Sequence, residues 1–212
     1  MSTSRTLRSA LTVVALSGGL VLGLAPAASA VPPNIPDTET AQTMLTELEV
    51  APDGSMDGYD RDEFPHWSTV SDNCNTREEV LKRDGEGVEV GEDCYPTSGS
   101  WFSPFDGETR SEPSDISIDH MVPLANAWRT GAAEWTRDKR EQFANDLDDP
   151  QLIAVTPESN GAKGDSSPDE WKPEVREHWC DYGKSWIAVK DKWQLTVNEA
   201  EKGALEEMLG TC

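Results

Sequence analysis

The chain has 212 residues, with 18 Lys and Arg against 40 Asp and Glu, and a formal net charge of −22 at pH 7. Such a negative field repels phosphate, which argues against a protein that binds nucleic acid through a broadly basic surface. The length suits one domain with a core of its own.

Residues 1–30 have the layout of a secretory signal peptide. Arg5 and Arg8 give a positive start, residues 11–24 are apolar, and Ala28-Ser29-Ala30 is a small-residue cleavage site. The apolar part is too short for a comfortable membrane span. We therefore expect a secreted protein without a membrane anchor after cleavage. Loss of the two arginines changes the charge from −22 to −24.

The four cysteines all lie in the expected mature chain. An even count in a secreted protein favours disulfides, and no C-x-x-C pair suggests a zinc knuckle. Three pairings are possible. We favour the pairing that closes the shorter loops, Cys74–Cys94 and Cys180–Cys212, with about 3 kcal/mol of stabilisation from each bond.

The predicted elements form an α+β protein. Pro-rich residues 31–39 predict a flexible leader, so the domain is expected over residues 40–212. Hydrophobic spacing and turn residues then decide the elements. In chain order, the predicted helices cover 41–50, 76–83, 122–132, 133–146 and 157–163, and the predicted strands cover 85–91, 115–120 and 151–156.

The C-terminal part is the most regular. Six apolar residues at helical spacing form one stripe from Val175 to Trp193, which is more typical of a core helix than of a binding platform. Thr196-x-x-Glu199 has the pattern of a capping box for a last helix that ends near Gly210.

Residues 116–163 carry the residue types that phosphodiester hydrolysis needs. A histidine can deprotonate water, and a hard cation such as Mg²⁺ takes a few oxygen ligands. Asp119 and Asn160 can supply those oxygens, His120 can act as the base, and Lys163 can meet the phosphate. Neighbouring strand residues face opposite sides, so Asp119 and His120 can share a site only where the strand ends, as Pro123 suggests.

The order of these motifs resembles a known family. D-H-x-V-P-L at residues 119–124 is followed by the strand QLIAVT and by N-x-x-K-G-D at residues 160–165. This pattern is similar to the HNH, or ββα-metal, endonucleases. The stretches YDRDEFPHW, CNTREEVLKRD and FANDL, with others across the mature chain, resemble a secreted bacterial branch related to the C-terminal domain of GmrSD-type restriction enzymes.

The resemblance implies a small ββα-metal core surrounded by helices and stapled by disulfides. It makes His120 the general base and Asp119 and Asn160 ligands of a divalent metal, Mg²⁺ or alternatively Mn²⁺. In the family an Asn before the second strand braces the metal loop, and here Gln151 takes that place, with Asn145 as a nearby substitute. Substrate contacts are expected from Lys163 and Arg129.

The other histidines, and the arginines outside these motifs, are given no catalytic role. His66, among aromatic residues, is expected to be packed, and His178 to be exposed. Arg61 and Arg77 either touch DNA or form internal ion pairs, and we favour the internal role. A local excess of two positive charges between residues 128 and 140, from Arg129, Arg137, Lys139 and Arg140 against Glu134 and Asp138, predicts a modest basic strip.

These features predict a secreted, metal-dependent endonuclease that cleaves DNA with little sequence specificity and needs no obligate protein partner. Two alternatives remain: an RNase with the same site, and an inactive, disulfide-stapled binding protein. The intact residues Asp119, His120 and Asn160 favour an enzyme, whereas the charge favours the inactive protein. Because of that charge, binding of nucleic acid should be weak and salt-sensitive.

Overall fold

Two short strands and one helix form the centre of the molecule. The computed structural model describes Met1 and residues 31–71 and 73–212, so the predicted signal peptide lies outside the described residues apart from Met1. Strands β6 (Ser117–His120) and β7 (Leu152–Val155) pair antiparallel, with His120 opposite Leu152. Helix α5 (Pro157–Lys163) follows β7 after a single residue. The chain thus contains the predicted strand–strand–helix unit.

Helix α5 begins and ends at strong local signals. The Thr156 side chain accepts a hydrogen bond from the amide of Ser159, and Pro157 occupies the first turn, where its missing N–H costs nothing. Gly164 ends the helix with a φ of +54°, in the left-handed region that favours glycine. The predicted bounds of this helix are confirmed.

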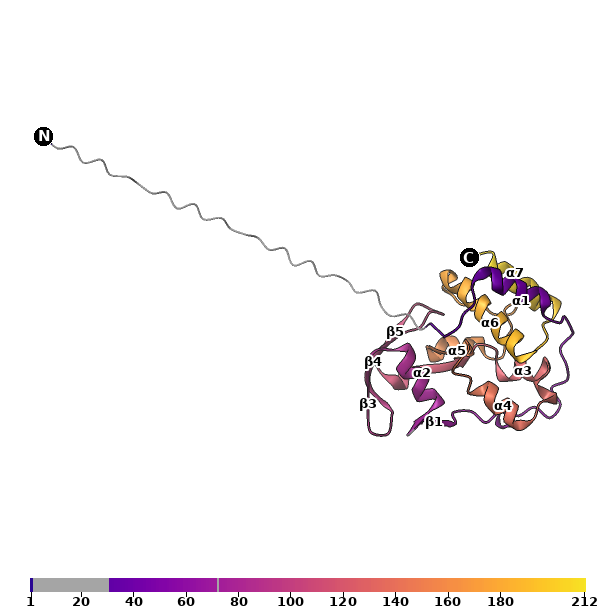
Figure 1. Cartoon of the computed structure of the whole chain (residues 1–212), viewed down its shortest axis with the longest axis horizontal. Coiled ribbons are helices and arrows are strands. Elements are labelled where there is room, and N and C mark those ends of the chain that lie inside the picture. Colours follow the sequence, from indigo (N-terminus) through magenta and orange to yellow (C-terminus); the bar gives the residue numbers. More distant parts are fainter. Residues whose placement is uncertain (2–30, 72) are drawn as a thin grey trace.

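Three helices from the two ends of the chain pack together beside this unit (Figure 1): α1 (Thr38–Glu47), α6 (Trp179–Trp193) and α7 (Glu199–Leu209). The predicted apolar stripe of α6 is buried at Tyr182, Trp186, Val189 and Trp193. Burial of these large side chains on the same face makes α6 the main core helix.

The ends of these helices correct three predictions. Helix α1 begins at Thr38, not at residue 41, because Asp37 caps it, and the expected flexible leader contacts the domain through Asn34, which donates to the carbonyl of Asp148. Helix α6 begins at Trp179, after a 3-10 turn, η4 (Arg176–His178). The last helix is capped by Asn198, which accepts from the amide of Glu201, rather than by Thr196.

A three-stranded sheet and helix α2 lie on the opposite side of the centre from α7 (Figure 1). The sheet has the antiparallel order β3 (Glu86–Val90), β4 (Pro96–Phe102) and β5 (Thr109–Arg110). The prediction included only the first of these strands. Helix α2 (Thr76–Asp84) has a complete capping box of Asn75 and Glu78.

The segment between β6 and β7 is less helical than predicted. It consists of α3 (Leu124–Arg129), the 3-10 turn η3 (Ala132–Glu134) and α4 (Arg137–Ala144). Gly131, with φ of +139°, separates the first two. Two further 3-10 turns, η1 (Arg61–Glu63) and η2 (Pro113–Asp115), precede β6, and the small pair β1 (Thr69–Ser71) and β2 (Cys74–Asn75) precedes α2.

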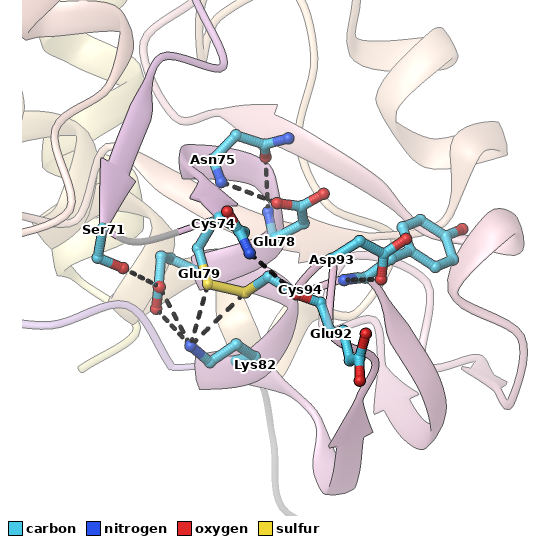
Figure 2. The surroundings of a disulfide bond; sticks show 11 residues. Ser71, Cys74, Asn75, Glu78, Glu79, Lys82, Glu92, Asp93 and Cys94 are labelled. Carbon is cyan, nitrogen blue, oxygen red and sulfur yellow. Dashed lines mark hydrogen bonds and ion pairs between the residues drawn. A yellow bond between two sulfur atoms is a disulfide. The ribbon is translucent and has the colours of Figure 1, made fainter.

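Both favoured disulfides are present. Cys74–Cys94 ties the start of α2 to the hairpin of β3 and β4, and Cys180–Cys212 ties α6 to the end of the chain after α7. Figure 2 shows Lys82 beside the first bond, with its ammonium 3.8 Å from the Cys74 sulfur and paired with Glu79. Because both thiols form the disulfide, the Cys74, Glu79 and Cys94 cluster has no thiolate for a metal.

No helix within the described part of the chain is long and apolar enough to cross a membrane.

Candidate active site

A small polar cavity opens at the end of β6. Its volume is about 80 Å³, enough for a few water molecules but too small for a nucleoside. The cavity brings together the three residues that the motifs single out, although they lie on two different elements. The wall is formed by Arg61, Ile118, Asp119, His120, Pro123, Leu124, Asn160 and Gly164.

Asp119 and His120 share this cavity because β6 ends there. The amide of Met121 makes one more ladder bond, to the carbonyl of Gln151, and the chain then turns at Pro123 into α3. The Gln151 side chain braces this turn: its Oε1 accepts from the amide of Val122, and its Nε2 donates to the Val122 carbonyl. Gln151 therefore holds the turn that follows β6 through both atoms of its amide.

His120 is buried and fixed in one tautomer. Its Nε2 lies 2.9 Å from the carbonyl oxygen of Ala144. A carbonyl only accepts hydrogen bonds, so Nε2 carries the proton and Nδ1 keeps its lone pair. Burial lowers the pKa of the imidazole to about 3, and the positive charge of Arg61 acts in the same direction. His120 is therefore neutral at pH 7, with an unprotonated Nδ1.

Asp119 forms a buried ion pair with Lys163. The Lys163 ammonium lies 3.0 Å from each carboxylate oxygen and 2.8 Å from the carbonyl of His120. Burial raises the pKa of the Asp119 carboxyl to about 6, against the opposing effect of Lys163, and burial lowers the pKa of Lys163 against the effect of Asp119. The lysine is 0% exposed, so the predicted phosphate contact is corrected: Lys163 supports Asp119 from the interior.

The donor set of the cavity fits a hard divalent cation. Oδ2 of Asp119 is buried and, although it faces the Lys163 ammonium, it has no hydrogen bond of good geometry. Asn160 donates from Nδ2 to the Ser117 hydroxyl at 2.5 Å, which directs its Oδ1 away from that bond. One carboxylate and one amide oxygen match the sparse protein ligation typical of Mg²⁺, which keeps several of its waters.

Two of the four positive side chains of the predicted basic strip are neutralised, whereas Arg137 and Lys139 form no ion pair within the described residues. Arg129 pairs with Asp53 at 3.0 Å and with Asp165 at 2.9 Å, and Arg140 pairs with Glu63 at 2.7 Å. The prediction that Arg129 contacts substrate is corrected accordingly, because its charge is already held by two carboxylates.

Arg61 is the arginine of the cavity wall. It is exposed, it lines the cavity beside Asp119 and His120, and it forms no ion pair within the described residues. The favoured internal role is therefore wrong for Arg61. Arg77 does have an internal role, but through hydrogen bonds to the carbonyls of Pro113 and Ile116, and the expected ion pair is absent from the described residues. No local pattern distinguishes the two arginines, because the tertiary fold alone brings η1 to the end of β6.

Three other predicted residues lie away from the cavity. Asn145 hydrogen-bonds the segment from Pro65 to Ser68 and thus braces a different loop from that of Gln151. His66 is half-buried against Trp67, as expected. His178 was predicted to be exposed, but it is half-buried against Phe105. Burial lowers the pKa of its imidazole to about 4.

A second cavity is larger, about 730 Å³, but its chemistry is wrong for phosphate. Four carboxylates line it against one lysine, Lys192, which is itself paired with Asp146. Like-charge repulsion therefore excludes a polyanion there. The acidic residues of its wall are Asp138, Glu141, Asp146 and Asp148.

Comparisons with known proteins agree with the resemblance. Residues 90–208 match the family model described as "GmrSD restriction endonucleases, C-terminal domain". A protein of Arthroderma benhamiae named "Uncharacterized secreted protein" is 54% identical over 201 residues, which cover 95% of this chain and 98% of the relative. No solved structure matches. The relative's name and the two disulfides indicate an extracellular protein, and because the relative is fungal they give the expected bacterial origin no support.

Proposed function

The chain belongs to the family of the C-terminal domain of GmrSD restriction endonucleases, and from this we propose that it is a secreted endonuclease that hydrolyses DNA phosphodiester bonds with the aid of a divalent metal. The observation that carries the proposal is the meeting of Asp119, His120 and Asn160 in one cavity. Asp119 would contribute a carboxylate oxygen that it shares with the Lys163 ammonium, His120 an imidazole lone pair, and Asn160 an amide oxygen.

In the proposed reaction, Nδ1 of His120 takes the proton from a water molecule that attacks the phosphorus. The Ala144 carbonyl keeps Nε2 protonated, so the lone pair stays on Nδ1. Asp119 and Asn160 would hold the cation, Mg²⁺ or Mn²⁺, with Lys163 fixing the carboxylate. When bound there, the cation would supply positive charge against the oxyanion that leaves.

Arg61 is proposed to bind the nonbridging oxygens of the scissile phosphate. A guanidinium matches two phosphate oxygens at once, and Arg61 is the cavity arginine whose charge no carboxylate in the described residues holds. The narrow cavity admits one phosphate group while the bases remain outside. Such a contact reads no base edge, which supports low sequence specificity.

The decisive experiment is a plasmid-nicking assay. Purified mature protein is incubated with supercoiled DNA in Mg²⁺, in Mn²⁺ and in EDTA, beside His120→Ala and Asn160→Ala. We expect nicking only with metal, and at least a 100-fold loss in His120→Ala, since a general base contributes about 10²–10⁴-fold. Absence of nicking under all metal conditions, or equal nicking by His120→Ala, would overturn the proposal. Folded RNA, run in parallel, tests the RNase alternative.

Arg61→Gln tests the phosphate contact. We expect kcat/KM to fall by about 10²-fold, as for the loss of one charged donor to a transition state, with partial recovery in Arg61→Lys, which keeps the charge but not the fork. Arg176→Gln is the matched control, because Arg176 is also exposed but lies outside the cavity wall. Equal kinetics for Arg61→Gln and Arg176→Gln would assign Arg61 no role.

A further inference from the structure

The His120 ring is contacted on one face as well as at its edge. The indole of Trp67 stacks on it, with ring centroids 5.6 Å apart and planes inclined by 30°. The hydrogen bond to Ala144 holds the edge. These two contacts come from segments that lie 24 residues after and 53 residues before His120 in the sequence. Together they leave the imidazole little freedom to rotate about its bond to the backbone.

Trp67 has an unusual backbone conformation. Its φ is +61°, in the left-handed region, which bulky side chains rarely adopt. Such a conformation costs free energy and persists only where the surroundings enforce it. In this conformation the indole stacks on His120 and also packs against the edge of the hydrophobic core.

Asn145 enforces this conformation. Its Nδ2 donates to the carbonyl of Pro65 at 2.8 Å, and its Oδ1 accepts from the amide of Ser68 at 2.9 Å, so one side chain spans the turn that contains Trp67. Its remaining amide hydrogen and lone pair are also used, by the Glu141 carbonyl and the Thr76 hydroxyl. With every polar atom engaged, the amide has a single orientation.

Asn145 directly follows Ala144 at the end of α4. Two consecutive residues therefore control the imidazole: the carbonyl of Ala144 fixes its edge, and the side chain of Asn145 fixes the aromatic ring that covers its face. We propose that Trp67 and Asn145 are positioning residues that keep Nδ1 of His120 directed into the cavity. This inference rests on the proposed function for its catalytic meaning.

The kinetic test compares Trp67→Phe, Trp67→Ala and Asn145→Asp with the wild type in the nicking assay. We expect Trp67→Ala to lower kcat at least 10-fold while KM changes less than about 2-fold, because the substrate contacts remain. Trp67→Phe keeps an aromatic face and should recover most of kcat. Asn145→Asp is nearly isosteric but cannot donate to Pro65, and should lower kcat in the same way.

Trp135→Ala is the matched control. Trp135 is also half-buried and packs on α4 through Phe143, but it makes no ring contact with His120. Its loss should lower the melting temperature while kcat stays near that of the wild type. An equal fall of kcat in Trp135→Ala and Trp67→Ala would show a general packing effect and overturn the inference.

An NMR measurement separates this inference from the proposed function. The ¹⁵N shifts of His120 should report the Nε2-protonated tautomer in the wild type, and its ring protons should show the upfield shift that a stacked indole causes. In Trp67→Ala the upfield shift should disappear and the tautomers should mix. An unchanged His120 spectrum overturns the positioning role even if the protein is an active nuclease. An inactive wild type with the expected spectral change instead overturns the proposed function alone.

Discussion

The carboxylate of Asp119 depends on Lys163, because burial by itself favours the protonated acid. The side chain of Lys163 is 0% exposed and that of Asp119 is 3% exposed, so solvent stabilises neither charge. Breaking a pair of this kind leaves one buried charge without a partner, which costs much more than the pair itself contributes.

Lys163→Met should therefore lower the free energy of unfolding by about 3–5 kcal/mol. In the double variant Asp119→Asn, Lys163→Met, no charge is left unpaired, and part of that loss should be recovered. Urea unfolding at pH 7 measures both. Additive losses in the double variant would contradict a coupled pair.

Because His178 is half-buried, we expect the free energy of unfolding to fall at acidic pH. Burial lowers the pKa of its imidazole from 6.5 to about 4, so in the folded protein it stays neutral where the unfolded chain binds a proton. Its contribution is fully present above pH 6.5 and is lost as the pH falls towards 4. The loss is at most about 3 kcal/mol, and less where solvent reaches the half-buried ring.

His178→Phe lacks this titration and fits beside Phe105. Denaturant unfolding of both proteins between pH 7 and pH 4 should show the variant gaining stability relative to the wild type as the pH falls. His120 titrates in the same direction in both proteins, so the difference isolates His178. Parallel curves would exclude the assignment.

At the residue scale, the motif residues and the supporting residues Gln151 and Asn145 could be named from the sequence, but the other residues around His120 could not. Asp119, His120 and Asn160 belong to two short motifs whose order signals a single site. Arg61, Trp67 and Ala144 reach the same place from loops and helix ends far along the chain, and nothing local distinguishes them from similar residues. Lys163 belonged to a motif but had the wrong expected role, since burial is a property of the fold.

Elements with local signals were predicted well. Helix α5 carries its own cap, its own proline and its own stop, so its bounds needed no tertiary information. Strands β4 and β5 were missed because pairing with β3 defines them, and pairing is not local. In the last helix, Asn198 rather than Thr196 caps the end, a shift of two residues that a motif search cannot resolve when both residue types are good caps.

The disulfides give a prediction for the elements that they join. The double variant Cys74→Ala, Cys94→Ala removes a bond between residues 20 apart in the sequence. The double variant Cys180→Ala, Cys212→Ala removes a bond between residues 32 apart. The chain-entropy relation gives losses of about 3 and about 4 kcal/mol. Denaturant unfolding measures them, and addition of dithiothreitol to the wild type should reproduce their combined effect. A wild type equally stable in dithiothreitol would contradict this.

For the whole molecule, the distribution of charge decides how substrate approaches. The net charge of −22 for the full chain repels DNA at long range. Arg129, Arg140 and Lys163 are held in ion pairs, which leaves Arg61, Arg137 and Lys139 without one among the described residues of the cavity wall and the basic strip. Few phosphates can then be contacted by free cations. We therefore expect the salt sensitivity of binding to be modest, because the slope of affinity against salt scales with the number of such contacts.

The logarithm of 1/KM should accordingly fall only slightly with the logarithm of monovalent salt, with a slope of about −1 to −2 at fixed Mg²⁺. At very low salt, long-range repulsion should weaken binding, so that the affinity has a maximum at moderate ionic strength. Steady-state kinetics at fixed pH, in KCl from about 10 to about 300 mM, tests both the shallow slope and the affinity maximum. A steep, monotonic decrease would require a basic surface elsewhere.

The two disulfides also decide in which compartment the folded protein is stable. Together they contribute about 7 kcal/mol, comparable to the whole stability of an ordinary domain. In a reducing cytosol neither bond persists, and the chain loses most of its margin against unfolding. If it is the nuclease proposed above, export is its activation step: the producing cell makes it without endangering its own chromosome, and the cleaving form arises only outside.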